Sequence, residues 1–374
     1  MKRLEDSKGL ALAMGIAMAT WACGSSGADG GSGGSSTAPS GGAANANGSS
    51  VNGGGGSSPA VQTGGIPGNA GAAAIGGAQN ASAAGASNGG GAAASGTGAA
   101  GGAAQPGGNC TPGKWPAADP TATGPFETVT ENEVGPEAGE ADEDTGTVPK
   151  FTLFRPKNLS PNGLCHPLIT WGNGTGSTPN LYRSLLGLFA SHGFVVIASN
   201  SKNVSRGDPK PMLVGVTWIL QQNEDPSSVL YHHLDPAQIG ATGHSQGAMA
   251  TSQAAGDARI TTNVPIEGAM VQRNLHGPAM FFCGGQDDIV GCDGAKNALN
   301  AVTTLPAMYA EYLSVDHGSW MSFNNKPSVV YGAVTAWMRV HLMADDSLRP
   351  WFYGEACQLC ADTGWQIQTK NMAP

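Results

Sequence analysis

From about residue 120 onward, short apolar runs alternate with stretches whose apolar residues recur at helical spacing. The runs are rich in branched and aromatic side chains, which favour strands. They predict strands at 126–130, 151–154, 167–171, 194–199, 238–242, 278–283 and 308–315. The stretches between them predict helices at 180–191, 211–222, 245–255, 294–304 and 329–343. Strands and helices in alternation predict an α/β fold, with a mostly parallel central sheet and helices on both faces.

The chain before this region lacks any such pattern. Residues 24–107 contain 28 glycines in 84 positions, and most of the remainder is Ala, Ser and Asn. Such a segment has too few apolar side chains to offset a backbone entropy of about 1 to 2 kcal/mol per ordered residue. We therefore expect a disordered linker over 24–107, followed by a single folded domain over 108–374.

The N-terminus has the pattern of an export signal. Three basic residues among the first eight precede an apolar stretch, 10–22, which is too short to span a bilayer as a helix. Small Ala22 directly before Cys23 resembles a bacterial lipoprotein cleavage site. We expect 1–23 to be a signal peptide, and the protein to be exported either as an outer-membrane lipoprotein with a lipidated Cys23 or as a freely secreted protein.

Charge excludes one class of partner. The net charge of −9 belongs entirely to 108–374, because basic and acidic residues cancel in the part before it. Phosphate binding needs a basic surface, so we expect no nucleic-acid partner. Nine acidic residues lie between Asp119 and Asp144, where a solvated acidic loop is favoured over a calcium site. We expect no metal.

Cysteine usage agrees with export. Six cysteines remain besides Cys23, an even number that allows three disulfides. Cys283 and Cys292 flank one short loop and are the favoured pair. The weaker predictions pair Cys357 with Cys360 and Cys110 with Cys165.

The motif Gly243-His-Ser-Gln-Gly247 matches G-x-S-x-G, the turn that carries a nucleophilic serine. The same pattern occurs twice within the glycine-rich linker, so the match alone is weak. Only Ser245 follows a predicted strand and begins a predicted helix. That context places its hydroxyl on a tight turn beside a helix N-terminus, whose N–H groups can stabilise a developing anion.

A serine nucleophile needs a base and an orienting acid, in the chain order Ser, Asp, His. His317 directly follows a predicted strand and is the favoured base. His276 precedes the loop that carries the favoured acid, so it would reverse the chain order of acid and histidine. His341 belongs to an amphipathic stretch and is expected on a helix surface.

The favoured acid is Asp287, where an apolar strand ends in glycines. Asp288 is the alternative, and Asp316 lies awkwardly close to the histidine in sequence. The backbone N–H groups of Gln246 and Thr175 are the expected oxyanion donors. Thr175 belongs to a glycine-rich loop after 167–171, which could also be a flexible turn without a function.

Over about 120–346, the chain resembles the bacterial cutinase and polyester hydrolase group of α/β hydrolases, which includes poly(ethylene terephthalate) hydrolases. The likeness rests on Gly124-Pro-Phe, Gly174-Thr, Ala190-Ser-His-Gly-Phe-Val-Val, Gly243-His-Ser-Gln-Gly, Asp287-Asp-Ile-Val, Asp316-His-Gly-Ser and Ala336-Trp-Met-Arg. The resemblance implies an α/β-hydrolase fold. It implies the same roles as above, with Ser245 as nucleophile, His317 as base, Asp287 as acid, and Thr175 and Gln246 as main-chain donors.

The departures from this family concern the substrate. Thr175 stands where an aromatic residue is usual, Gln246 stands where Met is usual, and the clamping Trp is replaced by Glu267 and Gly268. Trp320 either lines the cleft instead or lies in the core. Whether polyesters are cleaved is left open by these differences.

Together these features predict a cutinase-like serine carboxylic ester hydrolase. We expect it to form an acyl-enzyme, to use no cofactor, to act on small-molecule or polymeric esters, and to be a monomer. One alternative is an amidase or peptidase on the same triad. Another is a non-catalytic surface-binding module on a hydrolase scaffold.

Overall fold

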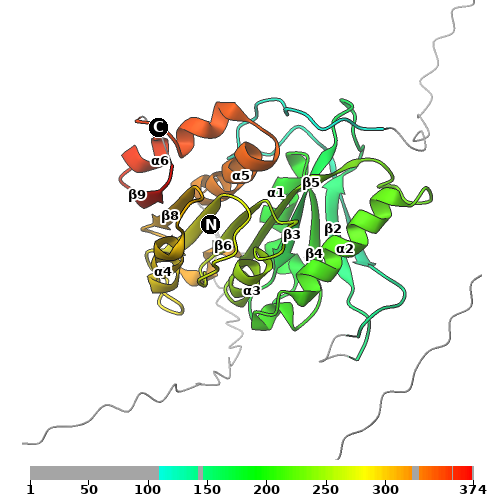
Figure 1. The fold of residues 1–374 in the computed structure, drawn as a ribbon, viewed down its shortest axis with the longest axis horizontal. Coiled ribbons are helices and arrows are strands. Elements are labelled where there is room, and N and C mark those ends of the chain that lie inside the picture. The colour runs from blue at the N-terminus through cyan, green and yellow to red at the C-terminus, as the bar shows by residue number, and fades with distance from the viewer. Residues whose placement is uncertain (1–108, 142–145, 322–327, 356, 373–374) are drawn as a thin grey trace, which may run out of the picture. The chain divides into compact units, whose positions relative to one another are not determined.

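The computed structural model describes residues 109–141, 146–321, 328–355 and 357–372. Over these residues the strands form a single sheet (Figure 1). Their bounds are β1 Thr128–Val134, β2 Phe151–Pro156, β3 His166–Gly172, β4 Val195–Ser199, β5 Leu234–His244, β6 Thr262–Ile266, β7 Ala279–Gly284, β8 Ala307–Tyr312 and β9 Trp365–Lys370. The spatial order is β1-β2-β4-β3-β5-β6-β7-β8-β9.

The middle of the sheet is parallel. Neighbouring strands run in the same direction from β4 through β3, β5, β6 and β7 to β8. β1, β2 and β9 pair antiparallel at the two sides. The carboxyl ends of the parallel strands therefore meet at one edge, where such sheets usually hold their reactive groups.

Helices cover both faces of this sheet (Figure 1). The helices α1 (Arg183–Ser191) and α5 (Ser328–Leu342) pack on one face, whereas α2 (Lys210–Glu224), α3 (Gln246–Ala254) and α4 (Asp293–Ala301) pack on the other. Strand β7 shows why both faces must be covered. Its residues are all buried, with Phe282 packed towards α5 and Phe281 towards α4.

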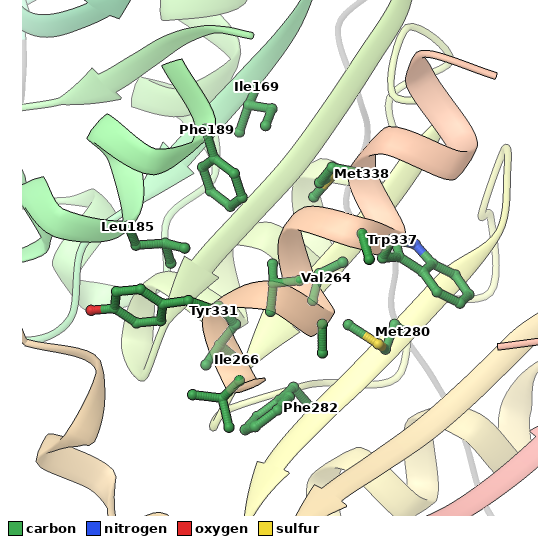
Figure 2. Close-up of a cluster of buried hydrophobic side chains, with 14 of the residues drawn as sticks. Ile169, Leu185, Phe189, Val264, Ile266, Met280, Phe282, Tyr331, Trp337 and Met338 are labelled. Atoms are coloured by element: carbon green, nitrogen blue, oxygen red, sulfur yellow. The ribbon is translucent and has the colours of Figure 1, made fainter. Parts of the chain in front are cut away.

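The larger core lies between the sheet and the α1/α5 layer. Figure 2 shows Leu185 and Phe189 of α1, and Trp337 and Met338 of α5, gathered over apolar strand residues. The strand side of this cluster consists of Ile169, Val264, Ile266, Met280 and Phe282, which are fully buried. These side chains fix α1 and α5 against the strands whose carboxyl ends carry the site described below.

The predicted α/β architecture, with a mostly parallel sheet and helices on both faces, is confirmed. All seven predicted strands and all five predicted helices are present, with bounds that differ by a few residues. The last predicted strand ends at Tyr312 instead of residue 315, because the chain turns there before the next loop.

Two strands were missing from the prediction. β6 contains Pro265, and a proline normally argues against a central strand because it has no N–H to donate. β9 is a partly exposed strand at one side of the sheet, where it pairs with β8.

The three expected disulfides are present. The structure pairs Cys283 with Cys292, Cys357 with Cys360, and Cys110 with Cys165. The first of these closes the loop after β7, and the last ties the segment before β1 to the start of β3. Each bridge therefore fixes a loop or a chain end that has little regular structure of its own.

The expectations for the signal peptide, Cys23 and the linker lie outside the described residues, as does the acidic run 142–144. Among the helices of the described part, none is long and apolar enough to cross a membrane.

Candidate active site

Ser245 lies on a strained turn between β5, which ends at His244, and α3, which begins at Gln246. Its φ of 58° and ψ of −123° are unusual for a residue with a side chain. The surrounding structure holds this conformation, because the Ser245 N–H donates to the carbonyl of Ile266 at 3.0 Å. The turn places the serine at the carboxyl edge of the sheet, with 9% of its surface exposed.

Glycines make this turn possible by letting α3 approach the strands. A Cβ at Gly247 would overlap the carbonyl oxygen of Gly172 in β3. A Cβ at Gly243 would lie 2.6 Å from the carbonyl oxygen of Gly247, closer than real Cβ contacts. Both flanking glycines of the sequence motif are therefore required by packing, and not only by the turn.

His317 is brought to the serine by the loop after β8. It begins the short 3₁₀ helix η3 (His317–Trp320), and its Nε2 lies 2.9 Å from Ser245 Oγ. Its Nδ1 lies 2.9 Å from Asp287 Oδ2. The carboxylate accepts the Nδ1 proton, so Nε2 is left to accept the serine proton.

Asp287 is oriented by its own loop, which follows β7. Its Oδ1 accepts the backbone N–H groups of Ile289 and Val290, each at 3.0 Å, and its Oδ2 faces the histidine. Burial alone would raise the pKa of Asp287, but the hydrogen bonds from His317, Val290 and Ile289 together lower it. The carboxyl is therefore held in its ionised, accepting form.

The structure brings Ser245, Asp287 and His317 together and leaves the alternatives apart. Asp288 is exposed, and Asp316 accepts a hydrogen bond from the Ser319 hydroxyl at 2.8 Å. The ring of exposed His276 faces the carbonyl of Gly256.

His341 is half-buried, which differs from the expected place on a helix surface. Its ring packs against Trp337, with centroids 4.4 Å apart, and its Nε2 lies 3.2 Å from the Tyr353 hydroxyl. The segment that follows α5 folds back over it, which a single helical pattern does not reveal.

The loop after β3 borders the serine. A Cβ on Gly174 would lie 3.3 Å from Ser245 Cβ, and the Gly174 N–H donates to the hydroxyl of Tyr182 at 3.1 Å. Exposed Thr175 follows directly. Gln246 belongs to the first turn of α3, where N–H groups have no partner within the helix. Thr175 and Gln246 thus lie on the two segments that flank the hydroxyl.

A buried carboxylate was missed as a site residue. Glu267 follows β6, is 0% exposed, and has a φ of 51°. Its Oε2 lies 3.1 Å from His244 Nε2 and 3.7 Å from His317 Nδ1. From sequence, this position stood out only as the replacement of an aromatic clamp. An acid directly after the strand beside the serine turn was the available signal.

Three buried ligand atoms, from His244, Glu267 and His317, lie within 4.8 Å of one another, a spacing that could hold a metal ion. The donor set does not fit that role. Both nitrogens of His317 face Ser245 and Asp287, and both nitrogens of His244 face Tyr182 and Glu267. We therefore assign these atoms to hydrogen bonding.

Trp320 lies in the core and not along a substrate cleft. It is 0% exposed, meets Phe282 edge to face at 4.8 Å between centroids, and stacks on Tyr331 at 5.7 Å. Its position three residues after His317 made a place at the rim equally plausible from sequence.

A family model described as PET hydrolase-like matches residues 184–363, a span that includes Ser245, Glu267, Asp287 and His317. No curated protein matches the chain. The family and the three disulfides fit an extracellular enzyme that hydrolyses esters. The resemblance to the cutinase and polyester hydrolase group is thus confirmed, and the match to the PET hydrolase-like family covers residues 184–363.

Proposed function

We propose that this protein is a serine carboxylic ester hydrolase that works through an acyl-enzyme on Ser245. The observation that carries the proposal is the pair of 2.9 Å contacts that joins the serine hydroxyl to His317 and His317 to Asp287. All three side chains are at least nine-tenths buried, so water competes little for these hydrogen bonds.

In the first half of the reaction, His317 Nε2 takes the proton of Ser245 as the serine oxygen bonds to the ester carbonyl carbon. The carbonyl oxygen becomes an anion, which the N–H groups of Thr175 and Gln246 would receive. The bond to the alcohol then breaks, and the alcohol leaves with the proton from Nε2. The acyl group is now held on the serine.

In the second half, His317 removes a proton from water, and the resulting oxygen attacks the acyl carbon. The bond to Ser245 breaks, the serine regains a proton from Nε2, and the acid departs. Throughout, Asp287 keeps its negative charge and holds the imidazole in the productive tautomer. Its lowered pKa supports that role.

The substrate we propose is a small or polymeric ester without a strong preference for flat aromatic groups. Thr175 and Gln246 lie beside the serine, where the family usually has an aromatic residue and Met, and Glu267 is fully buried at the site of the aromatic clamp. Ile289 and Val290, next to the acid, are exposed and offer an aliphatic contact surface.

We further propose that the catalytic domain, 108–374, acts as an exported monomer after the signal peptide has been cleaved off. In an outer-membrane form, the linker 24–107 would join this domain to Cys23, the lipid attachment point. The family match and the disulfides support export. Mass spectrometry of the mature N-terminus tests the anchor, since a lipidated protein carries acyl mass on Cys23.

The direct test of the catalytic proposal is Ser245→Ala, assayed with a short-chain p-nitrophenyl ester. We expect kcat to fall by about 10⁴-fold or more, with the thermal unfolding curve close to that of the wild type. Ser227→Ala is the matched control. This exposed serine lies in the segment before β5, whereas Ser245 follows the other end of the same strand. Undiminished turnover by Ser245→Ala would refute the proposal.

A further inference from the structure

Two features of Glu267 are energetically unfavourable, and a role in function would explain why the protein keeps them. Its carboxylate is completely buried, and its main chain has a positive φ of 51°, which is uncommon for a residue with a side chain. Gly284 at the end of β7 leaves the room for this side chain, because a Cβ there would overlap Glu267 Oε1. Strained, buried carboxylates of this kind gather at functional sites.

The carboxylate is held from one side by a chain of hydrogen bonds. Its Oε2 lies 3.1 Å from His244 Nε2, and His244 Nδ1 lies 3.0 Å from the Tyr182 hydroxyl. That hydroxyl also accepts the N–H of Gly174, in the loop that borders Ser245. With the tyrosine donating to Nδ1 and Nε2–H donating to Glu267, each of these groups has a partner and the carboxylate has a fixed direction.

The Glu267 carboxylate points towards His317, the proposed base. Glu267 Oε2 lies 3.7 Å from His317 Nδ1, the same nitrogen that Asp287 approaches to 2.9 Å. The two acids reach it from neighbouring strands, since Glu267 follows β6 and Asp287 follows β7. Nδ1 of His317 therefore has one carboxylate oxygen at hydrogen-bond distance, from Asp287, and a second oxygen just beyond that distance, from Glu267.

We propose that Glu267 is a second orienting carboxylate for His317, acting beside Asp287. In the intact protein Asp287 accepts the Nδ1 proton, and Glu267 adds negative charge next to the imidazolium that forms during catalysis. When Asp287 is removed, a small shift lets Glu267 accept the same proton. Glu267 touches no reacting atom and is a positioning residue. This inference rests on the proposed function, because it takes His317 as the base.

The test compares Asp287→Ala, Glu267→Gln and the double variant. Two readouts are used: kcat on p-nitrophenyl butyrate, and the rate at which a fluorophosphonate probe labels Ser245. We expect Glu267→Gln to lower kcat about 10-fold with KM unchanged. Asp287→Ala should lose only about 10²-fold, because Glu267 substitutes for it. The double variant should lose about 10⁴-fold, the loss associated with a misdirected tautomer.

Glu311→Gln is the matched control for loss of a buried acid. Glu311 is 9% exposed, lies on β8 and accepts a hydrogen bond from the Tyr309 hydroxyl. Its substitution should lower the unfolding midpoint without changing kcat, and without deepening the loss caused by Asp287→Ala. If Glu267 had only a structural role, Glu267→Gln would behave like this control, with a lower unfolding midpoint and an unchanged kcat.

Equal rates for Asp287→Ala and the double variant would overturn the proposal. If Glu267→Gln does not fold, Asp287→Ala decides alone: a loss near 10²-fold supports a second carboxylate, and a loss of about 10⁴-fold contradicts it. Wild-type protein that is neither labelled nor active would defeat the proposed function itself. Labelled, active wild type with equal rates in the two variants would defeat only the role of Glu267.

Discussion

The disulfide between Cys283 and Cys292 closes the loop that carries Asp287, and its removal should affect both stability and catalysis. The two cysteines have a sequence separation of 9, and Asp287 lies between them. In the chain-entropy description, closing a loop of this size stabilises the folded protein by about 2 to 3 kcal/mol. In a domain of this size that corresponds to a fall in Tm of roughly 4 to 12 °C.

The variant to examine is Cys283→Ala combined with Cys292→Ala. Calorimetry gives Tm, and hydrolysis of a short p-nitrophenyl ester gives kcat. We expect kcat to fall about 10-fold, because Asp287 becomes less precisely placed against His317. KM should rise slightly, because Ile289 and Val290 of the same loop belong to the proposed contact surface for the ester.

Cys357→Ala with Cys360→Ala is the control. This bridge has a sequence separation of 3 and lies between α5 and β9, outside the triad loops. Its loss should lower Tm without lowering kcat. The reasoning is refuted if both double variants reduce kcat equally, or if the Cys283/Cys292 variant turns over ester at the wild-type rate.

Two further predictions follow from packing and from a buried histidine. Gly247→Ala should cost about 1 to 3 kcal/mol in the free energy of unfolding and most of the activity, because the new Cβ overlaps the backbone of Gly172. Gly187→Ala in α1 is the control, because a Cβ there meets no other atom; it should be neutral or stabilise the protein by about 0.5 to 1 kcal/mol. Urea unfolding measures the stability of both variants. Equal effects of the two substitutions would contradict the packing argument. Burial lowers the pKa of His166 to about 4, so the unfolded chain binds a proton that the folded protein does not. Stability should therefore fall as the pH drops from about 6.5 to about 4, and His166→Gln should flatten that slope; an unchanged slope would argue against it.

The sequence predicted the architecture well where apolar runs are continuous. Strands such as Val195–Ser199 and Ala279–Gly284 are buried along their whole length, and this makes them visible as branched or aromatic runs. The serine turn could be distinguished from the two G-x-S-x-G matches in the glycine-rich linker only because it lies between a predicted strand and a predicted helix. Pattern and context together chose Ser245, Asp287 and His317, which the structure brings within hydrogen-bond distance of one another. Their catalytic roles stay a prediction.

What could not be predicted depends on contacts between distant segments. β6 was hidden by Pro265, and with it the meaning of Glu267, whose partners His244 and His317 come from other strand ends. Trp320 is three residues from His317 in sequence, yet its ring is buried against Phe282 and Tyr331. Neither the direction of a side chain nor its partners across the sheet can be read from local periodicity.

The central claim is that Ser245 is an activated nucleophile. It is tested most directly by reacting the folded, full-length protein with a fluorophosphonate probe and mapping the modified peptide by mass spectrometry. The account predicts one modified residue, Ser245, with labelling abolished by Ser245→Ala and strongly slowed by His317→Ala. Probe attached to a different serine, or labelling that persists at full rate in His317→Ala, would contradict it.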